Sequence, residues 1–159
     1  QSAAHLVQSL LEQNIPASLC THQQLPDIAA ATDIISCATM ATEPILQGDW
    51  LQPGVHIDLV GAFRPDMRET DDAVIRKASV FVDTRAGALA EAGDLTQAKA
   101  GGAFDDSDVI AEFSELCTGQ HSGRAGLAKS EQQRTLFKSV GAAREDLAAA
   151  MLAYENSRQ

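Results

Sequence analysis

Charged side chains gather where an apolar run ends, in the segment IDLVGAFRPDMRETDD that spans residues 57–72. The run that closes in Gly-Ala-Phe is typical of a buried strand, and Arg64, Asp66, Arg68 and Glu69 follow it closely. Two arginines at a strand end could hold a substrate carboxylate, or they could pair with the neighbouring acids on the surface, which we favour. Asp66 could be a helix-start acid or lie near a substrate.

Cysteine and histidine are the other side chains here that could do chemistry. None of the cysteines forms a CxxC pair and no two histidines have HExxH spacing; the residues are Cys20, Cys37, Cys117, His5, His22, His56 and His121. This spacing is unfavourable for a disulfide framework or a zinc site, so we predict no metal. Cys37 has no histidine near it in sequence, which favours a small buried residue over a nucleophile.

The composition limits the class of protein. A length of 159 residues with 45% hydrophobic and 4% aromatic residues indicates one helix-rich globular domain. The net charge of −10, without clusters of Lys and Arg, argues against nucleic-acid binding. No apolar run approaches the roughly 18–20 residues of a membrane span, and no signal-peptide pattern opens the sequence, so we expect a cytoplasmic protein.

Short apolar runs alternate with helical patterns over the first half of the chain. The patterns predict helices at 2–13, 26–32 and 65–78, strands at 15–21, 33–39, 55–62 and 79–84, and a connector at 42–54. Buried strands that alternate with helices are typical of a parallel sheet covered on both faces. We therefore predict an α/β fold.

The last third of the chain has a different character. The segment 86–107 is small, glycine-rich and polar without a clear core stripe, 108–119 reads as a helix closed by Gly119, and 120–134 reads as a surface loop. A strand-like piece then begins at Thr135, turns at 139–141 and continues as a long alanine-rich helix. That helix carries an apolar stripe of Leu147, Met151 and Tyr154, which predicts that it packs against another surface.

A phosphate-binding turn is not found in the sequence. Neither GxGxxG nor GxxxxGK occurs, although such a turn normally follows the first strand of a nucleotide-binding α/β fold. Either the fold uses no nucleotide, or the part that binds it lies outside these residues.

Three blocks of sequence, in order, resemble the second half of the ornithine cyclodeaminase and mu-crystallin family. They are TDIISCATMATEPILQGDWLQPGVHIDLVGAFRPDMRE (32–69), VFVDTRAGALAEAGDL (80–95) and TLFKSVGAAREDLAAA (135–150). Thr32 stands where the family usually has alanine before the aspartate. Similarity extends over nearly all of the chain.

The resemblance implies a Rossmann-type NAD(P)-binding domain joined to a second domain that forms the dimer interface and much of the substrate pocket. On this basis residues 1–134 are expected to be a partial Rossmann-type domain that lacks the first βα unit and the phosphate loop. Residues 135–159 are expected to return to the absent dimerisation and substrate domain. The chain then reads as a fragment of a longer homodimeric enzyme, and alone it should neither turn over nor bind dinucleotide tightly.

The same resemblance assigns candidate site residues, with NAD(P)H as the implied cofactor. Cys37, Ala38 and Thr39 correspond to the strand end beneath the cofactor, and Val60 and Gly61 to the strand end beside the nicotinamide. Ser139 and Val140 correspond to the segment that closes over the nicotinamide. Substrate contacts are implied for Phe63 and Lys138, and the catalytic residue stays unassigned.

Phe63 marks a departure within the family. Cyclodeaminases carry an acid/base aspartate just after VGG or VGA, whereas the mu-crystallin branch lacks it and keeps RPD-x-RE, as here. The resemblance therefore favours reduction of cyclic ketimines, Δ1-pyrroline-2-carboxylate or Δ1-piperideine-2-carboxylate, to proline or pipecolate. Ornithine cyclodeaminase and a mu-crystallin-like protein that binds NADPH or a small ligand without turnover are the alternatives.

Ordinary structural roles compete with two of these assignments. Phe63 could be a core aromatic at the end of its strand rather than a pocket wall. Lys138, at a strand-to-helix turn, could be a surface lysine whose stem lies along the protein, rather than a pocket residue. The sequence leaves both pairs of alternatives open.

Overall fold

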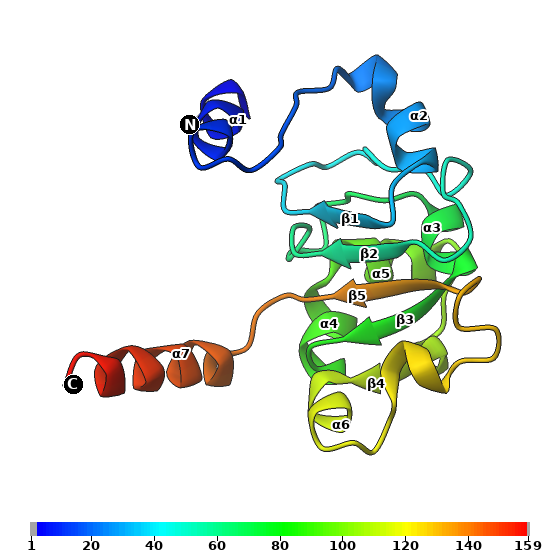
Figure 1. Cartoon of the computed structure of the whole chain (residues 1–159). Helices are drawn as coiled ribbons and strands as arrows, with labels where there is room; N and C mark the ends of the chain where they lie inside the picture. Colours follow the sequence, from blue (N-terminus) through cyan, green and yellow to red (C-terminus); the bar gives the residue numbers. More distant parts are fainter. Residues whose placement is uncertain (1–2, 159) are drawn as a thin grey trace.

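The computed structural model, which describes residues 3–158, contains a five-stranded parallel sheet in the order β1-β2-β5-β3-β4 (Figure 1). The strands are β1 (Ile34–Cys37), β2 (His56–Leu59), β3 (Ala78–Val82), β4 (Val109–Glu112) and β5 (Arg134–Lys138). The predicted parallel α/β architecture is therefore confirmed. The last strand in sequence, β5, lies in the middle of the sheet between β2 and β3.

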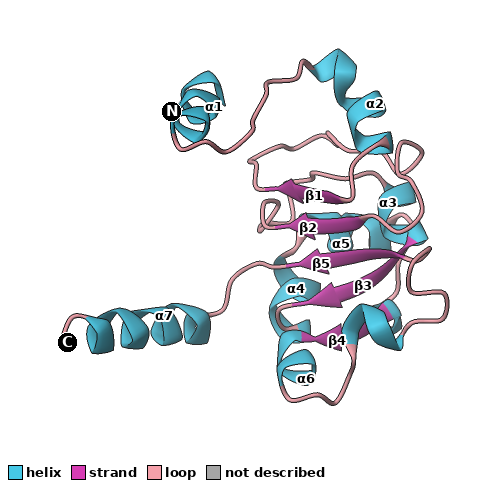
Figure 2. Ribbon diagram, in the orientation of Figure 1, coloured by secondary structure: helices cyan, strands magenta, loops and turns pink. Residues whose placement is uncertain are grey.

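One face of the sheet carries the hydrophobic core. Alternate residues of the central strands point to this face and are almost completely buried; they include Ile57, Leu59, Val80, Val82 and Leu136. They pack against α3 (Asp72–Lys77), α4 (Arg85–Glu91) and α5 (Gly93–Ala100), which lie behind the sheet in Figure 2. The helices contribute Val74, Ala88 and Leu95 to the same core.

The other face is covered over β3 and β5 by α6 (Phe113–Cys117) and the short helix η3 (Gly123–Gly126). Phe113 lies edge-on to Phe137 of β5, with ring centroids 6.1 Å apart. Arg124 donates hydrogen bonds to the Thr135 hydroxyl and to three backbone carbonyls. The predicted surface loop at 120–134 is thus fixed to the sheet by a partly buried arginine.

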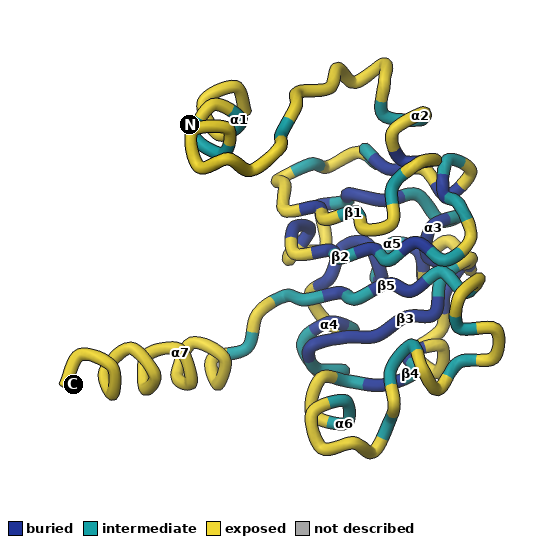
Figure 3. The backbone as a smooth tube through the Cα atoms, in the orientation of Figure 1, coloured by how far each residue is buried: buried dark blue, intermediate teal, exposed yellow. Residues whose placement is uncertain are grey.

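The two ends of the described chain lie outside this core. Helix α1 (Ala3–Glu12) matches the helix predicted at 2–13, of which Ser2 falls outside the described residues, and α2 (Leu25–Ala30) matches the prediction at 26–32. Helix α7 (Ala143–Asn156) has no buried residue and extends away from the sheet (Figure 3). Its apolar stripe contacts no other element of the described chain closely enough to be buried, so the packing predicted for it is absent within these residues.

Two predicted strands differ in the structure. Residues 15–21 form no strand, because no described segment offers them a hydrogen-bonding partner. Strand β1 exists but is an edge strand, and only Cys37 of its four residues is buried, while Ile34 is 67% exposed. The prediction that 33–39 is a buried strand was wrong on this point, because a buried strand needs neighbours on both edges and both faces.

The helix predicted at 65–78 begins only at Asp72. Asp71 is its cap, since its side chain accepts a hydrogen bond from the Val74 amide at 2.9 Å. The residues before it form an irregular loop, in which the amides of Glu69 and Thr70 bind the side chain of Asp94. The prediction failed because tertiary hydrogen bonds override the helical charge pattern of this segment.

The segment 85–119 was also misassigned. Helices α4 and α5 occupy the stretch in which the sequence showed no clear core stripe. No stripe was visible because small residues such as Ala88 and Ala98 fill the buried positions. The helix predicted at 108–119 is strand β4 followed by α6, after the short helix η2 (Asp106–Asp108). Within the described residues, no helix is both long and apolar enough to cross a membrane.

Candidate functional site

All five strands run in the same direction, so their carboxyl ends meet at one edge of the sheet (Figure 2). Parallel α/β sheets bind ligands at this edge. Because β1, β2 and β5 are neighbours, the three segments that carry the predicted site residues lie side by side. These residues are Cys37, Ala38, Thr39, Val60, Gly61, Phe63, Lys138, Ser139 and Val140.

Small and apolar side chains are exposed where β1 and β2 end. Ala38 and Thr39 are exposed, and Val60 is 47% exposed. The Thr39 hydroxyl accepts a hydrogen bond from the Ala41 amide at 3.2 Å, so its own proton is free to be donated.

Gly61 lies behind that surface rather than on it. The residue is buried, and a Cβ atom added to it would overlap the Glu69 carboxylate and the Thr39 carbonyl oxygen. Glycine at this position is therefore required by the close approach of Glu69 to the end of β2. The predicted cofactor contact of Gly61 stays a prediction.

Phe63 follows this turn with 43% of its surface exposed. The alternative that Phe63 is an ordinary core aromatic is wrong, because it lies outside the buried core of the sheet. Its ring is available at the strand edge, together with Met40, which is 72% exposed. A pocket-wall role for Phe63 is compatible with this placement.

Asp83 shapes the turn after β5. Its Oδ2 accepts hydrogen bonds from the amides of Val140 at 2.8 Å and Gly141 at 2.9 Å, and from the Ser139 hydroxyl at 3.2 Å. Gly141 has a φ of +89°, which a side chain would disfavour. Sequence reasoning missed Asp83, although an acid at the end of a buried strand, next to a polar turn, was a usable signal.

Lys138 is fully buried, so the alternative of a surface lysine is wrong. Its ammonium donates to the carbonyl oxygens of Leu59, at 3.3 Å, and Gly61. Burial lowers the pKa of Lys138, and the negative charges of Asp94 and Glu69 oppose that shift. The substrate contact predicted for Lys138 stays a prediction, and its burial favours an indirect role.

Two buried acids that sequence reasoning did not single out lie near Lys138. Glu69 accepts a hydrogen bond from the Thr39 amide at 2.5 Å, and Asp94 accepts from the Glu69 and Thr70 amides and the Thr70 hydroxyl. Both residues have no exposed surface. One oxygen of each, Glu69 Oε2 and Asp94 Oδ2, has no hydrogen-bond partner among the described residues.

Cys37 lies on the buried face of β1 beside these charges. Burial raises the pKa of its thiol to about 12, and the nearby negative charges of Glu69 and Asp94 add to the shift. The thiol therefore stays protonated at neutral pH and is a poor nucleophile. This agrees with the small buried residue expected from the sequence.

The charges that follow β2 are mostly structural. Arg64 and Asp66 form an ion pair of two exposed side chains at 2.9 Å, which confirms the surface interpretation for Arg64. Arg68 pairs with Asp72 and donates to the Thr70 carbonyl at 2.7 Å, so it holds the loop before α3. Asp66 starts no helix in the structure.

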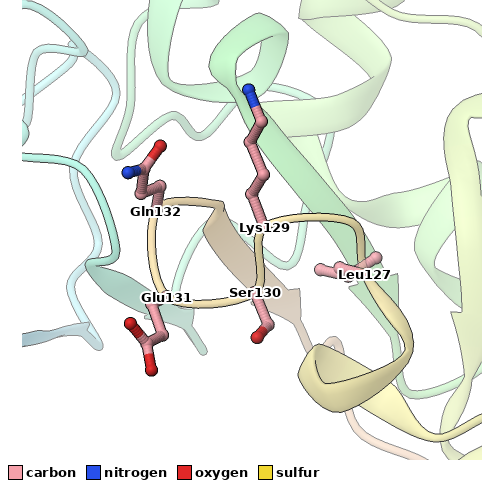
Figure 4. Close-up of a pocket in the computed structure, with 5 residues that line it drawn as sticks. All are labelled: Leu127, Lys129, Ser130, Glu131 and Gln132. Carbon is pink, nitrogen blue, oxygen red and sulfur yellow. The ribbon is translucent and has the colours of Figure 1, made fainter.

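A hollow beside the loop 127–132 lies away from these strand ends. Figure 4 shows its lining residues, with the side chains of Lys129 and Glu131 pointing in opposite directions. The loop leads into the first residue of β5, and so it lies at the amino ends of the strands. Within residues 3–158 there is no cluster of three His, Cys, Asp or Glu side chains that could hold a metal ion.

Comparison with known proteins gives one family and several relatives. Residues 1–159 match the model of the ornithine cyclodeaminase/mu-crystallin family. The chain is 42% identical over 130 residues to the ketimine reductase mu-crystallin of Mus musculus, a match that covers 82% of this chain and 37% of that protein. It is 39% identical over 149 residues to the Δ1-pyrroline-2-carboxylate reductase of Paracoccus denitrificans, covering 92% and 45% respectively.

A solved structure shows the same fold. The Δ1-pyrroline-2-carboxylate reductase of Thermococcus litoralis, in complex with NADH and L-proline, superposes with a TM-score of 0.83 at 33% identity. The match covers 96% of this chain and 46% of that one. The chain thus spans less than half the length of each of these three proteins.

Proposed function

The chain belongs to the ornithine cyclodeaminase/mu-crystallin family, and we propose that the complete protein is an NAD(P)H-dependent reductase of cyclic ketimines. Its substrates would be Δ1-pyrroline-2-carboxylate or Δ1-piperideine-2-carboxylate, and its products proline or pipecolate. Relatives named ketimine reductase and Δ1-pyrroline-2-carboxylate reductase, 42% and 39% identical to this chain, support the proposal.

The observation that carries the proposal is the exposed Phe63 at the end of β2. Cyclodeaminases of the family are expected to carry an acid/base aspartate here, and phenylalanine cannot transfer a proton. A protonated ketimine is already electrophilic, so its reduction needs orientation more than an acid at this position. An apolar ring would instead form a wall of the pocket and exclude water.

The residues at the strand ends fit a nicotinamide cofactor. Bound there, the reduced ring would supply a hydride to the C=N carbon. Exposed Ala38 and Val60 would offer it an apolar surface, and the free hydroxyl proton of Thr39 would offer a hydrogen bond. Ser139 and Val140, held by Asp83, would close the site from the side of β5.

The domain arrangement is part of the same proposal. Residues 1–134 would belong to the dinucleotide-binding domain, and 135–159 would lead back to the domain that supplies the dimer interface and the groups for the substrate carboxylate. Helix α7 supports this, since Leu147, Met151 and Tyr154 are each more than half exposed. An apolar stripe of this kind is usually buried in a complete protein.

A test of the complete protein would measure NADH and NADPH oxidation with Δ1-pyrroline-2-carboxylate and Δ1-piperideine-2-carboxylate. We expect turnover with at least one ketimine and no ammonia release from ornithine. Phe63→Asp is the matched variant, and we expect it to lower kcat/KM for the ketimine at least about tenfold, because it places a charge in an apolar wall.

Two other outcomes would each contradict the proposal. Release of ammonia from ornithine with catalytic NAD would identify a cyclodeaminase. Tight binding of NADPH without turnover of either ketimine would identify a mu-crystallin-like binding protein.

A further inference from the structure

A buried lysine ammonium supports the end of β2 from the face of the sheet that carries α3, α4 and α5. Lys138 has no exposed surface, and its Nζ donates to the carbonyls of Leu59 and Gly61 instead of pairing directly with a carboxylate. Burying a charge is costly unless its hydrogen bonds are made. The pairing of β2 with β5 ends at Leu59 and Lys138. The hydrogen bond from Lys138 Nζ to the Gly61 carbonyl therefore joins the two strands beyond their last paired residues.

The neighbouring strand end is held in a similar way. Glu69 accepts from the Thr39 amide just after β1, and Asp94 holds the backbone of Glu69. The amides of Val60 and Gly61 in turn donate to the Cys37 carbonyl, at 2.8 Å and 3.4 Å. Lys138 therefore joins the ends of β2 and β5, backbone hydrogen bonds join those of β1 and β2, and Glu69 links the end of β1 to the loop before α3.

We propose that Lys138 is a positioning residue, which fixes the turn Val60–Gly61 for the nicotinamide without contacting cofactor or substrate. The proposal rests on the proposed function, because it assumes that a cofactor lies over this turn. It differs from the substrate contact that the family resemblance implies for Lys138. The ammonium is enclosed by protein, and its two hydrogen bonds are made to the carbonyls on either side of Val60, that of Leu59 at the end of β2 and that of Gly61 in the turn.

The test uses the complete protein with the variants Lys138→Met and Lys138→Arg. Methionine keeps the length and the apolar stem of the side chain but removes the donor, and arginine restores a charged donor. Lys129→Met is the matched control, since Lys129 is exposed in the loop at the opposite edge of the sheet. Amide hydrogen exchange of residues 60–63, cofactor dissociation constants and kinetics with the ketimine would be measured for each.

For Lys138→Met we expect exchange at 60–63 to become about tenfold faster and cofactor binding about tenfold weaker, as suits the loss of a hydrogen bond from a charged group. The substrate KM at saturating cofactor should stay within about twofold of wild type. Lys138→Arg should recover most of both effects, and Lys129→Met should show neither. If Lys138→Met does not fold, Lys138→Gln takes its place. We then expect amide exchange to become faster at residues 60–63 and to stay unchanged in β4.

Unchanged exchange at 60–63 would overturn the inference, as would faster exchange without weaker cofactor binding. A rise in substrate KM alone would indicate a direct substrate contact and would also overturn it. If the complete protein binds cofactor but reduces no ketimine, the proposed function fails, while exchange and cofactor titration still decide the role of Lys138. A protein that binds neither NADH nor NADPH would overturn both.

Discussion

Buried charged side chains near the candidate site bond to the backbone rather than directly to each other. Asp83 holds the amides of Val140 and Gly141, Asp94 holds those of Glu69 and Thr70, and Lys138 holds two carbonyls. The bonds of Asp83 and Lys138 fix the chain at the ends of β5 and β2, and those of Asp94 fix the loop before α3. Substitutions here should therefore change the shape of the site before they change its surface chemistry.

Gly61→Ala should destabilise the chain by about 1–3 kcal/mol, because the new Cβ overlaps the Glu69 carboxylate and the Thr39 carbonyl in a packed interior. Gly126→Ala is the matched control, since its Cβ would lie 3.5 Å from Ser122 Cβ in ordinary contact. Urea denaturation of both variants measures the difference in the free energy of unfolding. Equal stability of the two variants would show that Glu69 and the Thr39 carbonyl both move aside at little cost.

The three thiols should differ in reactivity. Cys20 and Cys117 are exposed, whereas Cys37 is buried with a pKa of about 12, so only the first two should react with a disulfide reagent in the native chain at pH 8. Unfolding in urea should release Cys37. In Cys37→Ser the reaction of the two exposed thiols in the native chain should be unchanged, and the additional reaction after unfolding in urea should be lost. A rapid third thiol in the native wild-type chain would contradict the buried placement of Cys37.

The start of α3 shows how one side chain decides where an element begins. The Asp71 carboxylate accepts from the Val74 amide and also from the Gly48 amide at 3.0 Å, so it joins the helix to the connector before β2. The acids that precede it suggested a longer helix by their charge, but only Asp71 has the geometry of a cap.

Asp71→Ala should cost about 1–2 kcal/mol of stability, the usual range for loss of a helix cap. Asp66→Ala is the control, because Asp66 forms only an exposed ion pair with Arg64 and should contribute less than about 1 kcal/mol. Chemical denaturation followed by circular dichroism gives both values. An equal loss in the two variants would show that the cap contributes no more to stability than the exposed ion pair of Asp66.

Large apolar side chains are exposed on α7 and around β1. On α7 these are Leu147, Met151, Leu152 and Tyr154, and Ile28 of α2 and Ile34 of β1 are exposed as well. Surfaces of this kind favour association. We expect the 159 residues by themselves to form dimers or larger species.

Replacing the apolar stripe with charge should reduce this association. In Leu147→Glu/Met151→Glu, analytical ultracentrifugation should show a shift toward monomer, because the stripe can no longer be buried without cost. Ala149→Glu/Ala153→Glu adds the same charge to other faces of α7 and should have little effect. A wild-type chain that is strictly monomeric would show that the stripe drives no self-association.

The sequence by itself determined the alternation of strands and helices, the parallel sheet, the family, and the blocks that carry the candidate site. These follow from local periodicity and from residues that stand next to each other in the chain, such as the run that ends at Leu59. Only the tertiary structure decided that β5 lies between β2 and β3 and that Lys138 points into the protein. It also decided that Glu69 and Asp83 hold strand ends, and that Asp94 holds the loop that carries Glu69. The reason is physical: hydrogen bonds between residues tens of positions apart leave no periodic signal, and they form only once the sheet brings their partners together.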